Sequence, residues 1–161
     1  MDRKDIEEGE TGEELESYMI LKAAFTIFLF AWFLNFAWES FHGPFLYRMG
    51  EMIGITTPQG FVPLIAWVSV KDALLVLVLY GATALVLREK LWKEGAGVRE
   101  MCTLGLLGVL TAAGIEYHAL STGRWAYSQL MPTVLGIGVS PLLQLGATGI
   151  IAVIVADWIR K

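Results

Sequence analysis

The chain has 161 residues, of which 55% are hydrophobic and 17% are charged, and its formal net charge is −4. This length suits one domain, and the composition is too apolar for an ordinary soluble domain. The sequence has no basic patch, so we expect no nucleic-acid partner, and its single cysteine excludes an internal disulfide.

An acidic segment opens the chain. Residues 1–18 contain eight acidic and two basic side chains, and few apolar residues that could be buried. We therefore predict a disordered cytoplasmic tail over 1–18 and a membrane domain over 19–161. The first apolar run follows an acidic rather than a basic segment and lacks a cleavage site of small residues. This favours a retained first span over a signal peptide.

Four apolar runs predict membrane-spanning helices near 20–41, 64–87, 101–120 and 141–158. Their charge-free centres are about 15 or 16 residues long, short of the roughly 20 that a span needs. Each helix must therefore continue past its polar residue, or the outer loops must complete the span. The predicted fold class is all-α, a four-helix transmembrane bundle.

Lysine and arginine residues are distributed unevenly between the two ends of these runs. Nine lie at one end and only Arg48 and Arg124 lie in the loops at the other, with Lys71 near the start of the second run. The nine are Arg3, Lys4, Lys22, Arg88, Lys90, Lys93, Arg99, Arg160 and Lys161. This bias predicts a multi-pass protein of the cell membrane with both termini in the cytoplasm.

The two outer loops, 41–63 and 121–140, are too apolar to be free aqueous loops, so we expect interfacial segments that roof the bundle. The chain also shows a weak internal repeat. Glu39 and Glu116 are 77 residues apart, and Pro63 and Pro141 are 78 apart. This spacing favours two tandem helical hairpins in the same orientation.

Three carboxylates are predicted to lie at one depth in the membrane. Glu39 lies 17 residues from the charged residue at the inner end of its run, and Asp72 and Glu116 each lie 16 residues from theirs. At about 1.5 Å per residue, each is roughly 24–26 Å from its inner boundary, in a hydrocarbon core about 30 Å thick. Ionisable groups at such a depth are costly, so this layer in the outer leaflet is a candidate functional site.

Small residues mark the helix faces that should approach one another in a membrane. Asn35, Glu39 and His42 share such a face on the first run, and Glu116 and Gln144 continue similar faces on the third and fourth runs. We therefore expect Asn35, Glu39, Glu116 and Gln144 to face the centre of the bundle.

Acid–base chemistry is one function that these residue types would support. Two carboxylates in a low-dielectric site cannot both ionise cheaply, so one can hold a proton and donate it to an apolar substrate. The candidate catalytic residues are Glu39, Glu116, Asp72 and His42. The candidate substrate-binding residues are Asn35, Trp38, His118, Arg124, Trp125, Tyr127 and Gln144.

Other interpretations remain open at this point. The polar residues could form a hydrogen-bonded knot that only fixes helix packing in a structural or accessory subunit. His42, His118 and the three carboxylates are also suitable metal ligands, although no HxxxH or HExxH spacing occurs. A proton or ion conduit is a further alternative. The sequence identifies no cofactor and leaves open a homo-oligomer or a larger membrane complex.

A local motif adds a resemblance. Glu116, Ala119, Gly123, Trp125 and Tyr127 follow an acidic-x-x-Ala-x-x-x-Gly-x-Trp-x-aromatic pattern. Pro141-Leu142-Leu143-Gln144 comes after it. About 30 residues resemble the small membrane lycopene cyclases and related carotenoid-modifying proteins, where a Pro-x-Glu-type motif follows. Gln144 stands where that pattern has a carboxylate, and an amide cannot act as a general acid. The resemblance implies a membrane lipid or isoprenoid ligand that is protonated and deprotonated without net redox change.

Overall fold

The computed structural model describes residues 3–48, 54–55, 57–90 and 95–160, with side chains described from Gly12 onward. Its elements are α1 (Arg3–Leu46), α3 (Pro58–Leu87), α5 (Val98–Ser121), β1 (Thr133–Val134), β2 (Ile137–Gly138) and α6 (Val139–Arg160). Within the described residues, four helices are long and apolar enough to cross a membrane. The predicted all-α, four-helix transmembrane bundle is confirmed.

Each helix is longer than the apolar run that predicted it. Helix α1 continues past Glu39 to Leu46, α3 starts at Pro58 well before Asp72, and α5 continues past Glu116 to Ser121. Helices that incorporate their polar residue reach the length a membrane requires. The residues that the short charge-free centres lack for a full span are therefore supplied by the helices themselves and not by the outer loops.

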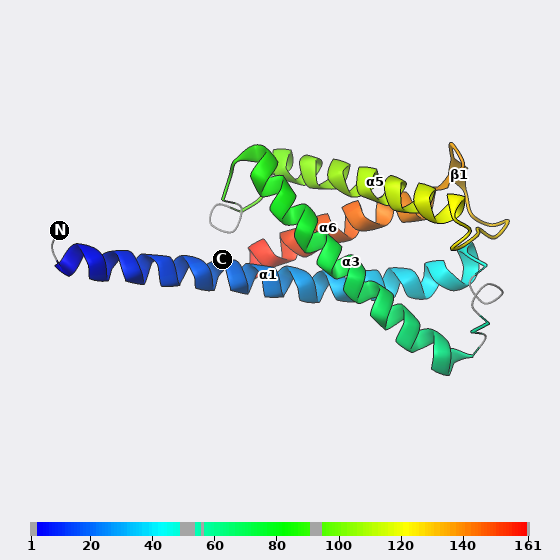
Figure 1. Cartoon of the computed structure of the whole chain (residues 1–161), viewed down its shortest axis with the longest axis horizontal. Coiled ribbons are helices and arrows are strands. Elements are labelled where there is room, and N and C mark those ends of the chain that lie inside the picture. Colours follow the sequence, from blue (N-terminus) through cyan, green and yellow to red (C-terminus); the bar gives the residue numbers. More distant parts are fainter. Residues whose placement is uncertain (1–2, 49–53, 56, 91–94, 161) are drawn as a thin grey trace.

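The acidic N-terminal segment is helical from Arg3 onward, whereas the sequence predicted a disordered tail. Helix α1 begins at Arg3 and runs without interruption into the first span. A helix that is already nucleated by an apolar span extends at low cost, because each further residue adds a backbone hydrogen bond without a new nucleation step. Figure 1 shows this part of α1 projecting well beyond the other helices. Where it meets them, Glu16 accepts a hydrogen bond of 2.8 Å from Lys90.

Local signals set the helix ends. Pro58 is the first residue of α3 and follows Thr57 in extended conformation, which suits a residue without a free N–H. The same helix ends at Arg88, whose φ of 58° is left-handed and whose N–H bonds back to Leu85. At the start of α5, Glu100 accepts a 2.8 Å hydrogen bond from the N–H of Gly97.

The helices pack as two neighbouring hairpins, α1 with α3 and α5 with α6, and α1 also packs along α6. The hairpin formed by β1 and β2 lies at the same end of the bundle as the end of α1 and the start of α6 (Figure 1). We call this the outer end. The duplication suggested by the repeat spacing stays a prediction, since no observation tests it.

Small and apolar side chains fill the bundle on the side away from the outer end. Ile27, Ala73, Val76, Ala152 and Val153 are all at most 1% exposed. The two alanines allow the helix backbones to approach closely, and the isoleucine and valine side chains fill the remaining space with dispersion contacts. Helices α5 and α6 approach closely, since a Cβ added at Gly108 would lie 2.7 Å from the backbone of Gly146.

The two outer segments are joined to each other across the bundle. Tyr47 and Tyr127 form an antiparallel β-bridge, with Arg48 N–H bonded to Ala126 O and Ser128 N–H bonded to Leu46 O, each at 2.9 Å. This backbone pairing fixes the end of α1 against the segment that follows α5. It places two tyrosine side chains side by side at the outer end, with ring centroids 5.3 Å apart.

A pair of glycine substitutions on α5 tests the close helix packing. Gly108→Ala should destabilise the bundle by about 1–3 kcal/mol, because the new methyl group overlaps the Gly146 backbone. Gly114→Ala is the matched control, since nothing lies within 4 Å of a Cβ there. It should be neutral or stabilising by about 0.5–1 kcal/mol. Equilibrium unfolding in detergent measures both; equal effects would contradict a tight α5–α6 contact.

Candidate functional site

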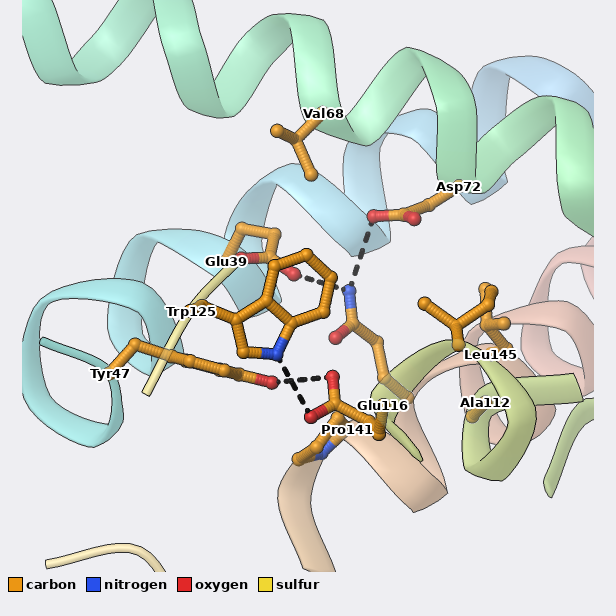
Figure 2. A pocket seen from close by; sticks show the side chains of 11 residues that line it. Glu39, Tyr47, Val68, Asp72, Ala112, Glu116, Trp125, Pro141 and Leu145 are labelled. Atoms are coloured by element: carbon orange, nitrogen blue, oxygen red, sulfur yellow. Dashed lines mark hydrogen bonds between the residues drawn. The ribbon is translucent and has the colours of Figure 1, made fainter. Parts of the chain in front are cut away.

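A cavity of about 140 Å³ lies near the outer end of the bundle, between α3 and α5. Figure 2 shows the carboxylates of Glu39, Asp72 and Glu116 around this space, with the Trp125 ring beside it. All four helices contribute to its wall. The lining residues are Glu39, Tyr47, Val68, Asp72, Ala112, Ile115, Glu116, Trp125, Pro141, Gln144 and Leu145. The cavity therefore combines an apolar wall with three acidic side chains.

Glu116 is surrounded by hydrogen-bond donors. Tyr47 donates to its Oε1 at 2.7 Å, and Trp125 Nε1 donates to its Oε2 at 3.2 Å. The Tyr127 hydroxyl also bonds to Oε2 and itself accepts the N–H of Gly138 at 2.9 Å. An indole N–H can only donate, and a hydroxyl that accepts a backbone N–H has its own proton free to donate. The arrangement is that of a carboxylate accepting three hydrogen bonds.

These donors come from segments that the outer end brings together. Tyr47 follows α1, and Trp125 and Tyr127 follow α5, so the β-bridge between Tyr47 and Tyr127 places both hydroxyls over the end of α5. The N–H of Gly138, in β2, then fixes the Tyr127 hydroxyl. The outer segments thus form a roof over the bundle, from which the polar groups of Tyr47, Trp125 and Tyr127 converge on Glu116.

Glu39 and Asp72 have a different environment. Gln144 Nε2 lies 2.9 Å from Glu39 Oε1, 3.4 Å from Asp72 Oδ2 and 3.0 Å from Asn35 Oδ1. An amide nitrogen carries only two hydrogens, so three acceptors compete for two donors. Two carboxylates that share one neutral donor in a buried site repel each other unless one of them holds a proton.

The position of Gln144 is fixed by buried neighbours. Asn35 Oδ1, which accepts the Gln144 amide, also accepts the Thr148 hydroxyl at 3.3 Å, and Asn35 Nδ2 donates to Ala31 O at 2.8 Å. The side chains of Asn35 and Thr148 are at most 2% exposed. Residues of α1 and α6 therefore hold the amide in place between the two carboxylates.

His42 lies one turn beyond Glu39, with its Nδ1 3.9 Å from Glu39 Oε1. Its ring packs against the Tyr47 ring with centroids 4.8 Å apart. The residue is 4% exposed, and neither ring nitrogen has a hydrogen-bond partner among the described residues. His42 is thus buried next to the cavity without lining it.

Both roof tyrosines are held in the protonated form. Burial raises the pKa of Tyr47 above its ordinary value, and the neighbouring Glu116 carboxylate raises it further by charge and hydrogen bonding. Burial and the hydrogen bond to Glu116 likewise raise the pKa of Tyr127, against a smaller opposite effect of the Gly138 N–H. The two hydroxyls therefore remain donors to Glu116.

The structure gathers most of the residues that the sequence singled out, and leaves three apart. Glu39, Asp72, Glu116, Trp125 and Gln144 line the cavity. Asn35 and Tyr127 bond directly to that group, and His42 lies beside it. In contrast, Trp38 bonds to Ser140 between α1 and α6, and the His118 and Arg124 side chains are exposed.

Sequence reasoning missed Tyr47 and Thr148 as parts of this site. Tyr47 lies 80 residues before Tyr127, close to but not in register with the 77- and 78-residue spacings of the suggested repeat, so the repeat gave only a weak signal for it. Thr148 lies one helical turn after Gln144 on the same face. Within the described part of the chain, no three His, Cys, Asp or Glu side chains are grouped as metal ligands. The site geometry therefore gives no support to the metal interpretation.

No family model, curated protein or solved structure matches this chain. The resemblance of the segment around Glu116 and Trp125 to lycopene cyclases stays a prediction.

Alkaline titration tests the environment of the roof tyrosines. A tyrosine with a raised pKa in the folded state loses its proton first in the unfolded state, so stability falls as the pH rises above about 10. Tyr47→Phe should make this alkaline loss of stability smaller, as measured by unfolding at several pH values. Tyr117→Phe, at an exposed position of α5, is the matched control. An unchanged pH dependence in Tyr47→Phe would contradict a buried hydroxyl at Glu116.

Proposed function

We propose that this multi-pass membrane protein binds an isoprenoid or a similar apolar lipid in the cavity and transfers protons to and from it. The observation that supports this most is the unequal environment of its carboxylates. Glu116 accepts three hydrogen bonds, whereas Glu39 and Asp72 compete for one amide. Acids and bases on one site are usually distinguished by environments that differ in this way.

The pair of Glu39 and Asp72 is the acid in this proposal. One of the two carboxyl groups carries a proton, because two charges in the apolar cavity are costly. It donates the proton to a carbon of a substrate double bond, so that a C–H bond forms from the π electrons and a carbocation remains. The side-chain amide of Gln144, which lies within hydrogen-bond distance of both carboxyl groups, keeps Glu39 and Asp72 in position during this step.

Glu116 is the base. It removes a proton from a carbon next to the cation, and the C–H electrons form the new double bond. The number of electrons on the substrate is unchanged, so the step needs no redox cofactor. The Trp125 ring, which lines the cavity beside Glu116, favours a cation through its negative face. The apolar wall of Val68, Ile115 and Leu145 keeps water from the cation.

This chemistry is the kind that the resemblance to lycopene cyclases implies. Gln144 occupies the place of a carboxylate in that pattern, and in this chain Glu39 and Asp72 supply carboxylates at the same amide. The general acid in this chain therefore comes from α1 and α3, and Glu116 remains the acidic residue of the motif.

A structural role is the second candidate. The hydrogen bonds of Gln144 connect α6 to α1 and α3, and such contacts between helices stabilise membrane bundles. Under this interpretation, Glu39→Gln and Glu116→Gln would change stability by less than about 2 kcal/mol and nothing else, because an amide still forms hydrogen bonds.

Deuterium transfer tests the acid–base proposal. The protein in nanodiscs is incubated in D2O with lycopene, an acyclic polyene, and the recovered lipid is analysed by mass spectrometry. We expect deuterium on the carbon chain, and a decrease of about 100-fold in its rate for Glu39→Gln and Glu116→Gln. Glu100→Gln, on the same helix α5 but at its first turn, should retain the rate. Labelling no greater than with empty nanodiscs would overturn proton transfer to a polyene.

We also propose that both termini lie in the cytoplasm, on the basis of the nine-to-two distribution of Lys and Arg. In a variant that carries Cys102→Ser, an impermeant thiol reagent added outside intact cells should label Thr133→Cys. It should not label Val98→Cys. Both positions are exposed, so accessibility within the protein does not distinguish them. The reverse labelling pattern would overturn this orientation.

A further inference from the structure

A hollow of about 220 Å³ lies at the end of the bundle opposite the outer end. Residues of α1 and α6 form most of its wall, and Tyr80 of α3 completes it. In Figure 1 this end of α6 lies far from β1 and β2. None of the residues that line the hollow lines the cavity between α3 and α5. The hollow is therefore a separate feature of the bundle.

The hollow lies at the level where the apolar part of the spans begins. Lys22 and Arg160 line it, and the apolar runs of α1 and α6 beside them contain no charged residue for 16 residues each. This is the depth at which lipid chains meet their head groups. Leu15 and Tyr18 at its rim are 61% and 62% exposed, whereas Ile27 at its floor is 1% exposed. The hollow is thus open to lipid at the membrane boundary.

One buried polar group in the hollow has no partner. Tyr80 is 9% exposed and lines the hollow, yet its hydroxyl makes no hydrogen bond within the part of the chain that the structure describes. The hydroxyl lies close enough to Asp157 and Arg160 for their charges to act on it. Buried polar groups nearly always have a partner, so this hydroxyl indicates a group bound in the hollow.

The charges around the hollow favour an anion. Lys22 forms no ion pair with any residue that the structure describes. Asp157 is already engaged, since its Oδ1 accepts Arg160 at 3.2 Å and its Oδ2 accepts the N–H of Ala96 at 2.7 Å. A guanidinium has five N–H donors, so the bond to Asp157 leaves others for a ligand. Two cations and one acid line the described hollow, which leaves a balance of one positive charge.

Three donors on three helices select the ligand group. Lys22 belongs to α1, Tyr80 to α3 and Arg160 to α6. A phosphate has tetrahedral oxygens that accept hydrogen bonds from several sides, whereas a carboxylate is planar. A phosphodiester also carries one negative charge, and basic pockets between membrane helices bind lipid head groups. We propose that the hollow binds a phospholipid through its phosphate, which contacts Lys22, Tyr80 and Arg160. Its chains lie along the apolar wall at Ala23 and Ile159.

This site goes beyond the proposed proton transfer and does not depend on it. It lies at the opposite end of the spans, and Glu39, Asp72 and Glu116 do not line it. The phosphate joins a cation of α1 to a cation of α6. A lipid that binds only the folded bundle therefore stabilises the packing of these two helices.

Native mass spectrometry of the delipidated full chain in detergent tests the proposal. The ligands are dioleoyl phosphatidylglycerol, dioleoylglycerol without the phosphate, oleic acid with a carboxylate, and glycerol 3-phosphate without chains. Phosphatidylglycerol should bind about ten-fold more tightly than each of the others, as a hydrogen-bonded charge would give. Equally tight binding of dioleoylglycerol or oleic acid would overturn recognition of a phosphate. Equally tight binding of glycerol 3-phosphate would overturn a lipid ligand.

Two variants remove one donor each. Lys22→Met, which keeps the length of the side chain, should weaken phosphatidylglycerol binding about ten-fold and leave dioleoylglycerol binding unchanged. Tyr80→Phe should weaken phosphatidylglycerol binding about five-fold. The matched controls are Lys71→Met, whose ammonium lies over the Trp67 ring, and Tyr117→Phe at an exposed position of α5. Unchanged binding in both Lys22→Met and Tyr80→Phe would contradict the proposed contacts.

A measurement on the unaltered protein guards against variants that fail to fold. A photoreactive phosphatidylglycerol is crosslinked to the protein in nanodiscs, and the labelled peptides are identified by mass spectrometry. Labelling should concentrate on residues 15–27 of α1 and 156–160 of α6, which border the hollow. Excess phosphatidylglycerol should suppress it, and excess dioleoylglycerol should not. Even labelling along all four spans would indicate only surrounding bulk lipid and would overturn the site.

Discussion

The packing of the helices at the outer end depends on the hydrogen bonds of one side-chain amide, that of Gln144. It lies at the meeting point of three helices and approaches two carboxylates and an asparagine oxygen. In a membrane, where water does not satisfy polar groups, each buried acceptor needs a partner from a neighbouring helix. The helices can therefore pack at the outer end only in an arrangement that brings these acceptors to one amide.

The bundle consequently has two unlike halves. On the side away from the outer end, small and apolar residues such as Ala31 and Val76 bring the backbones together. Near the outer end, Glu39 and Glu116 keep the helices apart around a cavity, and the bridge between Tyr47 and Tyr127 closes the space above them. The first half supplies packing that offsets the cost of burying acids in the second.

The sequence predicted the part of this arrangement that follows helical periodicity. Lengths and charge placement identified four spans, and small-residue faces indicated that Glu39, Glu116 and Gln144 point inward. The depth argument placed Asp72 in the same layer as both glutamates, and the structure has all three around one cavity.

What the sequence did not predict depends on contacts between distant segments. The role of Tyr47 requires the backbone pairing with Tyr127, 80 residues later, and no local pattern encodes that pairing. His118 is only two residues from Glu116, yet a helix turns neighbouring side chains to different sides, so it lies outside the site. The helical state of the acidic segment arose from continuity with the first span, which composition alone does not reveal.

The length of α1 determines how far the first span extends. Its 44 residues, at about 1.5 Å each, make a rod of about 66 Å, roughly twice the thickness of the hydrocarbon core. A helix of this length exceeds the hydrocarbon core, so the first span continues beyond the lipid chains, where Glu16 accepts the hydrogen bond of Lys90.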